Sequence, residues 1–288
     1  MPYLYLLGAV LFASATKVFA AGYGKKNQNE KAATPLYNLV YAICVCVIWG
    51  ISYAITPTFK VGVFPYALGF GVCYALATIG LVYAVKTGPL ALTSLVVALS
   101  LTATAVWGLL FWDSTLTWFV GLGLSLIVVS LWLCLRKGQS MVRISWRWGV
   151  FAGMAFVGNA GCTIVQRMQQ TAFEGRYGSA LMFFGTVIST IVCIVLYVRV
   201  GKGDGKKILK SPTACLPVLG AATNVLLNVC MMRMATSILS PTLIYPTVSV
   251  GGIVVVSLFS LSVFREKMTR LQWLGVGVGA VAVALLSL

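Results

Sequence analysis

The sequence predicts an all-α, polytopic membrane protein with ten transmembrane helices. Of its 288 residues, 60% are hydrophobic and only 9% are charged, whereas roughly a quarter of the residues in soluble domains carry charge. The apolar residues form continuous runs of about 20, the length at which a helix crosses a hydrocarbon core of about 30 Å. Spanning strands would instead alternate apolar and polar residues over about ten positions. A soluble fold could not cover this much apolar surface.

Ten apolar ranges follow one another along the chain. In order, they are residues 2–22, 35–56, 62–85, 89–111, 116–135, 147–168, 177–199, 213–235, 239–264 and 271–288. The longest connections, 23–34, 136–146 and 200–212, are too short for an extramembrane domain. We expect the first range to be a retained helix and not a cleaved signal, because basic residues follow it and none precedes it.

The basic residues predict how the chain is oriented in the cell membrane, which is an inner membrane or a plasma membrane. Sixteen of the 21 Lys and Arg residues fall in the connections after the odd-numbered ranges, and four fall in the others. Because cytoplasmic loops carry the excess of positive charge, the basic loops are expected in the cytoplasm and both termini outside. The net charge of +16 is therefore explained by topology, and it does not indicate a nucleic-acid partner.

The two halves of the chain, 1–138 and 139–288, resemble each other. In each half a cation precedes the fourth range, a proline lies at the start of that range, and an acid and a glycine-rich helix follow it; Asp113 and Glu266 are the acids. Five helices in each half would place the second half inverted in the membrane. A 5+5 inverted repeat around a midplane site is the architecture of alternating-access carriers.

The segment from Phe264 to Gly275, with Glu266 before a glycine-rich last helix, resembles the drug/metabolite transporter superfamily, in particular its EamA-like ten-helix members. The resemblance covers the whole chain at the level of topology. It implies transport of a solute through a central cavity lined mainly by the first, third, fourth, sixth, eighth and ninth helices. It also implies cytoplasmic termini, in contrast to the charge count.

Polar residues inside the apolar ranges are the candidate substrate-binding residues, because a polar group in hydrocarbon needs a partner or a watery cavity. Lys17 is the one ionisable residue well inside a range, and Ser14 lies on the same helix face. The remaining candidates lie at helical spacing in three other ranges: Asn159, Thr163 and Gln166; Asn224 and Asn228; and Thr242, Tyr245 and Ser249. Tyr74 and Tyr83 carry less weight. Helix–helix hydrogen bonding is the structural alternative for all of these residues.

These patterns favour a membrane transporter of a small metabolite, working by alternating access as a facilitator or exchanger. No Asp, Glu or His lies inside an apolar range, so a neutral, zwitterionic or anionic substrate is expected rather than a cation. A flippase for a lipid-linked substrate and a membrane scaffold without transport remain as alternatives. The sequence contains no catalytic constellation, and its eight cysteines lack ligand spacing, so neither an enzyme nor a metal or other cofactor is expected. The expected partners are the solute and the lipid bilayer, with the chain a monomer or homodimer.

Overall fold

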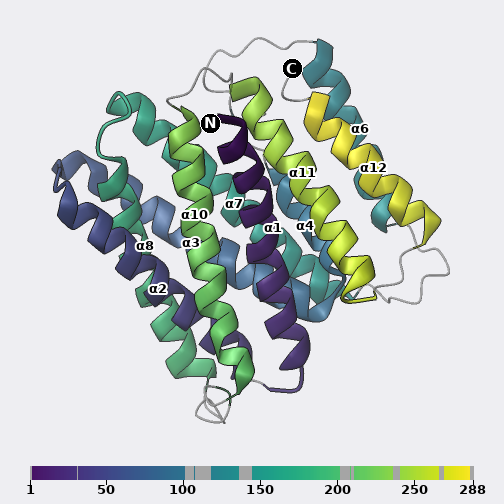
Figure 1. Ribbon diagram of the computed structural model, residues 1–288, viewed down its shortest axis with the longest axis horizontal. Coiled ribbons are helices and arrows are strands. Elements are labelled where there is room, and N and C mark those ends of the chain that lie inside the picture. The colour runs from purple at the N-terminus through teal and green to yellow at the C-terminus, as the bar shows by residue number, and fades with distance from the viewer. Residues whose placement is uncertain are drawn as a thin grey trace.

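The computed structural model describes residues 2–30, 32–100, 107, 118–135, 145–201, 208, 211–235, 241–265 and 269–285 (Figure 1). In this part of the chain all regular structure is helical, without strands. The α-helices are α1 (Pro2–Lys26), α2 (Ala33–Ile55), α3 (Phe64–Thr87), α4 (Leu90–Ala98), α6 (Trp118–Leu135), α7 (Trp146–Ala172), α8 (Gly178–Val200), α10 (Cys215–Ala235), α11 (Pro241–Ser262) and α12 (Arg270–Leu285). Short 3₁₀ turns, Val61–Val63 and Pro212–Ala214, precede α3 and α10.

One α-helix falls in each apolar range that the sequence defines, with boundaries that differ by a few residues. The largest difference is in the fourth range, where α4 ends at Ala98 and positions 101–106 and 108–111 lie outside the described residues. Local signals fix several boundaries. Ser145 caps α7 by accepting a hydrogen bond from the Trp148 amide at 3.2 Å, and proline begins α11.

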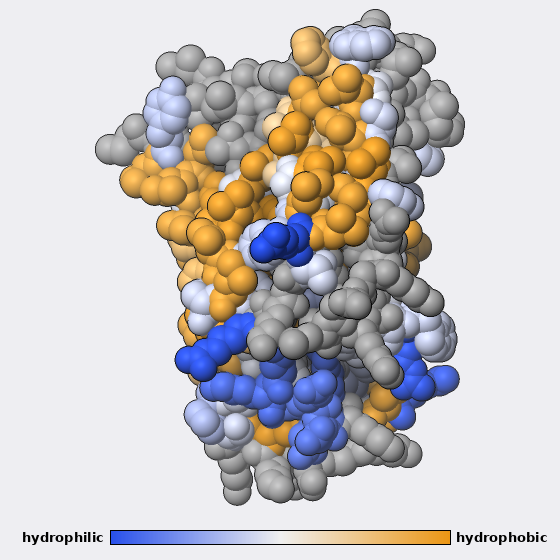
Figure 2. Space-filling view, turned by 90° about the vertical axis from the view of Figure 1, so that its right-hand side faces the viewer, coloured by the Kyte–Doolittle hydropathy of each residue, from blue (hydrophilic) through white to orange (hydrophobic). Residues whose placement is uncertain are grey.

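Within the described ranges, six helical segments are long and apolar enough to cross a membrane. They are Tyr3–Lys26, Ala33–Ile55, Val61–Thr87, Trp146–Ala172, Gly178–Val200 and Pro212–Met231. Large apolar side chains point outward from them, such as Ile55, which is 75% exposed. Figure 2 shows an apolar band across one face, with most of the hydrophilic residues gathered below it. An outward-facing apolar surface on several long helices is that of a multi-pass membrane protein.

The helices pack in a bundle that brings distant segments together. Helix α1 packs against α10 and α11, α3 packs against α7 and α8, and α2 packs against α8 and α10. Helix α4 contacts α7 and α11, while α6 and α12 pair at one edge of the molecule (Figure 1). The start of α1 and the end of α12 lie on the same side of the bundle (Figure 1).

Glycines allow α3 and α7 to approach with backbones in contact. A Cβ atom added at Gly80 would lie 2.5 Å from the Ala155 nitrogen, and one added at Gly158 would lie 2.7 Å from the Cys73 carbonyl oxygen. Only glycine leaves room for this approach, which is the way small residues serve membrane helix interfaces. The contact sets the separation of two helices that both carry polar residues toward the interior.

Gly158→Ala should therefore destabilise the fold. Overpacking of a tight contact costs about 1–3 kcal/mol, because the two backbones must separate. Gly153→Ala is a matched control on the same helix, since nothing lies within 4 Å of its added Cβ. Unfolding in mixed detergent and denaturant micelles measures both variants. Equal stability of the two would contradict the close α3–α7 contact.

Candidate functional site

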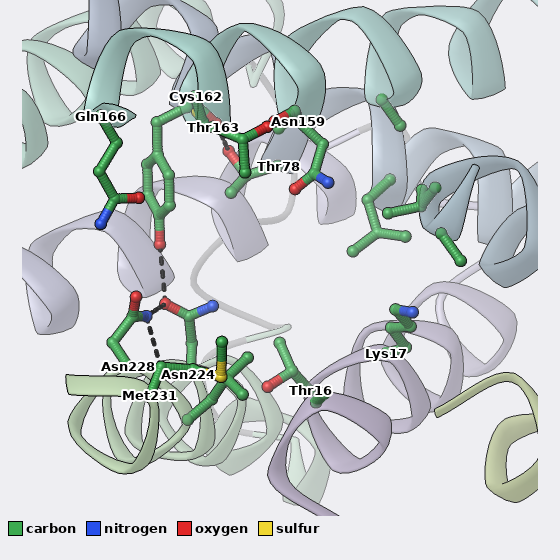
Figure 3. Close-up of a pocket in the computed structure, with 18 of the residues that line it drawn as sticks. Thr16, Lys17, Thr78, Asn159, Cys162, Thr163, Gln166, Asn224, Asn228 and Met231 are labelled. Carbon is green, nitrogen blue, oxygen red and sulfur yellow. Dashed lines mark hydrogen bonds between the residues drawn. The ribbon is translucent and has the colours of Figure 1, made fainter. Parts of the chain in front are cut away.

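A cavity of about 320 Å³ lies inside the bundle (Figure 3). It is lined mainly by α1, α3, α4, α7, α10 and α11, with Tyr41 of α2 and Met182 of α8 completing the wall. These six helices fall in the first, third, fourth, sixth, eighth and ninth apolar ranges. This volume is in the range of pockets that hold small molecules, roughly 300–1,000 Å³.

The cavity gathers most of the residues that the sequence singled out. Those that line it are Lys17, Asn159, Thr163, Gln166, Asn224, Asn228 and Ser249. Ser14 does not line it: this side chain is buried and donates a hydrogen bond to the Val10 carbonyl at 2.7 Å, within α1. The side chains of Thr242 and Tyr245 lie outside the described part of the structure. The polar residues of α1, α7 and α10 thus converge on one space.

Lys17 supplies the one cationic side chain among the described residues that line the cavity. Its ammonium group faces the open space (Figure 3), and the side chain is half-buried. Within the described residues no hydrogen bond or ion pair joins it to another side chain. A cation in apolar surroundings is costly unless an anion or water accompanies it. Lys17 is therefore positioned to bind a negatively charged group that enters the cavity.

A chain of hydrogen bonds crosses the cavity wall from α2 to α10. The hydroxyls of Tyr41 and Tyr74 lie 3.1 Å apart, and the Tyr74 hydroxyl donates to Asn224 Oδ1 at 3.1 Å. Asn228 Nδ2 donates to the Asn224 carbonyl at 2.8 Å and to Asn224 Oδ1 at 3.3 Å. Because a carbonyl only accepts, the bond to the backbone identifies which end of the Asn228 amide is the nitrogen. Four polar side chains are held in one arrangement.

Asn159 of α7 is fixed from the opposite wall. Its Nδ2 donates to Ser100 Oγ at 2.6 Å, and the Ser100 hydroxyl donates in turn to the Val97 carbonyl at 2.6 Å. Thr163, one turn further along α7, donates to the Asn159 carbonyl at 2.9 Å. The side-chain amide of Asn159 therefore has its nitrogen tied to the α4 segment and its oxygen turned to the open space (Figure 3).

Several lining residues were not selected from the sequence. Thr16 and Thr78 line the cavity, although both hydroxyls also donate to backbone carbonyls in their own helices. Tyr41 was missed as well. Tyr74, which was given little weight, is a wall residue, whereas Tyr83 lies outside the wall and stacks on Phe151 at 4.7 Å. Among the described residues, no group of three His, Cys, Asp or Glu side chains could hold a metal ion.

Comparison with known proteins bears on the fold alone. No protein-family profile matches the chain, and no curated protein sequence matches it. Solved structures do match. One of them, a crystal structure of a protein, is similar over 96% of this chain and 95% of that chain, with a TM-score of 0.55 and 11% sequence identity. The arrangement of helices is thus known in a solved protein of nearly the same extent.

The hydrogen bond between Tyr74 and Asn224 should contribute a small but measurable coupling energy to the stability of the fold. In a double-mutant cycle of Tyr74→Phe and Asn224→Ala, we expect about 0.6 kcal/mol, because hydrogen bonds between membrane helices average near that value. Unfolding in mixed micelles gives the four free energies. Tyr53→Phe with Asn224→Ala is the matched control, since Tyr53 instead stacks on Phe183 at 5.3 Å. A coupling of zero for the first pair would contradict the bond.

Proposed function

We propose that the protein is a transporter that carries a small anionic metabolite through this cavity by alternating access. The observation that supports the proposal most strongly is Lys17, a cation that faces a 320 Å³ interior cavity and has no ion-pair partner among the described residues. A solute anion would complete the site, and the asparagine and glutamine side chains would orient it. A carrier of this kind needs no resident cofactor.

The pattern of helix contacts supports a 5+5 inverted repeat of ten spans. If α1, α2, α3, α4 and α6 correspond in order to α7, α8, α10, α11 and α12, the main contacts between the two halves should occur in matching pairs. The contact of α3 with α7 corresponds to that of α1 with α10. Likewise α3–α8 corresponds to α2–α10, and α4–α7 to α1–α11. The pairs α2–α8, α4–α11 and α6–α12 correspond to themselves, as expected across a two-fold axis.

This exchange symmetry suggests how the carrier would work. In an inverted repeat, the two halves can adopt each other's conformations, which closes one side of the central site and opens the other. Helices α3 and α7 contact through backbone, whereas α1 and α10 meet through side chains such as Thr16 and Thr223, whose hydroxyls lie 2.9 Å apart. Two equivalent interfaces packed differently are the asymmetry that alternating access requires.

The orientation that we propose follows the distribution of basic residues. With the basic loops in the cytoplasm, both termini would lie outside, in the inner or plasma membrane. The start of α1 and the end of α12 lie on the same side of the bundle, as expected for an even number of spans (Figure 1). Membership of the EamA-like drug/metabolite transporters is part of this proposal and rests on the junction around Glu266.

A facilitator or exchanger is the simplest mode of transport. The described residues that line the cavity include no Asp, Glu or His, which are the usual proton relays in carriers. A scaffold would have packed Asn159, Asn224 and Asn228 against one another, yet Asn159 bonds to Ser100 instead and borders a cavity. A lipid-linked substrate would require the cavity to open toward the bilayer.

Lys17→Met should strongly reduce transport of anionic solutes while leaving the fold intact or more stable. Proteoliposome counterflow with radiolabelled carboxylates measures transport, and we expect a loss of at least about tenfold, equivalent to about 1.4 kcal/mol. Because an unpaired cation within a span costs on the order of 3 kcal/mol, its removal should raise the free energy of unfolding.

Lys60→Met is the matched control. Lys60 is exposed on the connection before α3, with its ammonium 5.5 Å from the centre of the Phe173 ring and outside the cavity. It should transport as the wild type does. Unchanged carboxylate transport by Lys17→Met would refute the assigned role of Lys17, and absence of carboxylate counterflow by the wild type would refute the proposed function.

A further inference from the structure

The hydrogen-bond network also determines which atoms of the cavity remain available to a ligand. An amide has one donor end and one acceptor end, so a side chain whose nitrogen is already bound presents its oxygen, and the reverse. Three asparagines of the cavity, Asn159, Asn224 and Asn228, are held in this way, and the free ends of Asn159 and Asn224 face the open space (Figure 3). The amide atoms left free, together with the charge of Lys17, restrict which solutes can bind more narrowly than the charge alone.

Asn224 presents its nitrogen. Its Oδ1 accepts from the Tyr74 hydroxyl at 3.1 Å and from Asn228 Nδ2 at 3.3 Å. Reversing the amide would set its NH₂ against the NH₂ of Asn228, which is itself fixed by the Asn224 backbone carbonyl at 2.8 Å. Asn224 Nδ2 therefore faces the open space (Figure 3) and can donate to a ligand.

Asn159 presents its oxygen. The Ser100 hydroxyl gives its proton to the Val97 carbonyl at 2.6 Å, so Ser100 Oγ can only accept from Asn159, at 2.6 Å. The nitrogen of Asn159 must take that position, and Oδ1 is left facing the cavity. When a solute displaces water from the cavity, this amide oxygen needs another donor, and a ligand hydroxyl would supply one.

From this polarity we propose that the solute is a monocarboxylate with an apolar body and a neutral hydroxyl near the carboxylate. This inference rests on the proposed transport function and narrows its substrate class. In this assignment the carboxylate binds the Lys17 ammonium, Asn224 Nδ2 donates to the solute from the facing wall, and the hydroxyl donates to Asn159 Oδ1. One cation balances one negative charge. The apolar part lies against Phe70, Leu81 and Leu227, which line the same cavity.

The same geometry discriminates against an amino group at the position of the hydroxyl. An ammonium could also donate to Asn159 Oδ1, but it would bring a second positive charge into the space that Lys17 faces. The described residues that line the cavity offer no carboxylate to neutralise it. Like charges in a poorly solvated site repel strongly, so a hydroxy acid is favoured over the corresponding amino acid.

Three probes with one skeleton test the inference on the purified full-length protein: phenyllactate, 3-phenylpropanoate and phenylalanine. On the carbon atom next to the carboxylate they carry a hydroxyl, a hydrogen and an ammonium, respectively. We expect phenyllactate to bind about three- to tenfold more tightly than 3-phenylpropanoate, the effect of one neutral hydrogen bond. Phenylalanine should bind more weakly than both. Ligand-induced thermal shifts give affinities, and counterflow gives transport.

Asn159→Asp should invert the preference. A carboxylate in place of the amide repels the acid group of phenyllactate and attracts the ammonium of phenylalanine, so phenylalanine becomes the tighter ligand. Asn29→Asp is the matched control for added charge, because Asn29 is exposed in the turn after α1. It should leave the wild-type ranking unchanged. Ser100→Ala is a second test, since it frees the Asn159 amide to rotate and should reduce the preference for phenyllactate.

The outcomes separate this inference from the function on which it rests. Equal affinity of the wild type for phenyllactate and 3-phenylpropanoate, or tightest binding of phenylalanine, would overturn the hydroxy-acid inference even where Lys17-dependent carboxylate transport is present. Absence of carboxylate counterflow by the wild type would instead overturn the transport proposal. The wild-type ranking decides the inference without any variant, so a variant that fails to fold leaves the test intact.

Discussion

A polar side chain inside an apolar bundle is costly unless it binds another polar group or faces water, and the cavity wall of this protein is organised by that constraint. The buried hydroxyls of Thr93 and Ser130 are satisfied by Trp148 Nε1 at 2.9 Å and the Gly275 carbonyl at 2.7 Å, respectively. The asparagines of α7 and α10 use half of each amide in the same way. The amide atoms that these bonds leave free face one cavity, as the Lys17 ammonium does. The same side chains therefore form hydrogen bonds within the helix bundle and are available to bind a ligand.

Much of the site could be predicted because polar residues are rare in such a sequence and helical spacing places them on a face. Asn159 and Thr163, and likewise Asn224 and Asn228, lie one turn apart, and each pair lines the cavity. The same reasoning failed for Ser14, whose spacing from Lys17 was suitable but whose hydroxyl bonds within its own helix. Spacing gives the face of a helix and does not give the extent of the cavity.

Other features depended on contacts between segments far apart in the chain. Nothing in the sequence near Tyr41 indicates that its hydroxyl would meet that of Tyr74, because aromatic residues in spans are commonly packing or interface residues. The helices themselves were easier to predict, since a long apolar segment has few stable backbone conformations other than a helix in a bilayer. The approach of α3 and α7 through Gly80 and Gly158 also required coordinates, because glycines are frequent in membrane helices.

A binding site between the helices requires above all that water reach the space between them. A variant without the eight native cysteines would carry single cysteines at Thr163 or Asn228, which line the cavity, or at Val157 or Leu226, which are 60% and 45% exposed on the outer surface of the same helices. In membranes, a small hydrophilic thiol reagent should modify the first pair and spare the second. Protection of the first pair and modification of the second would contradict the account.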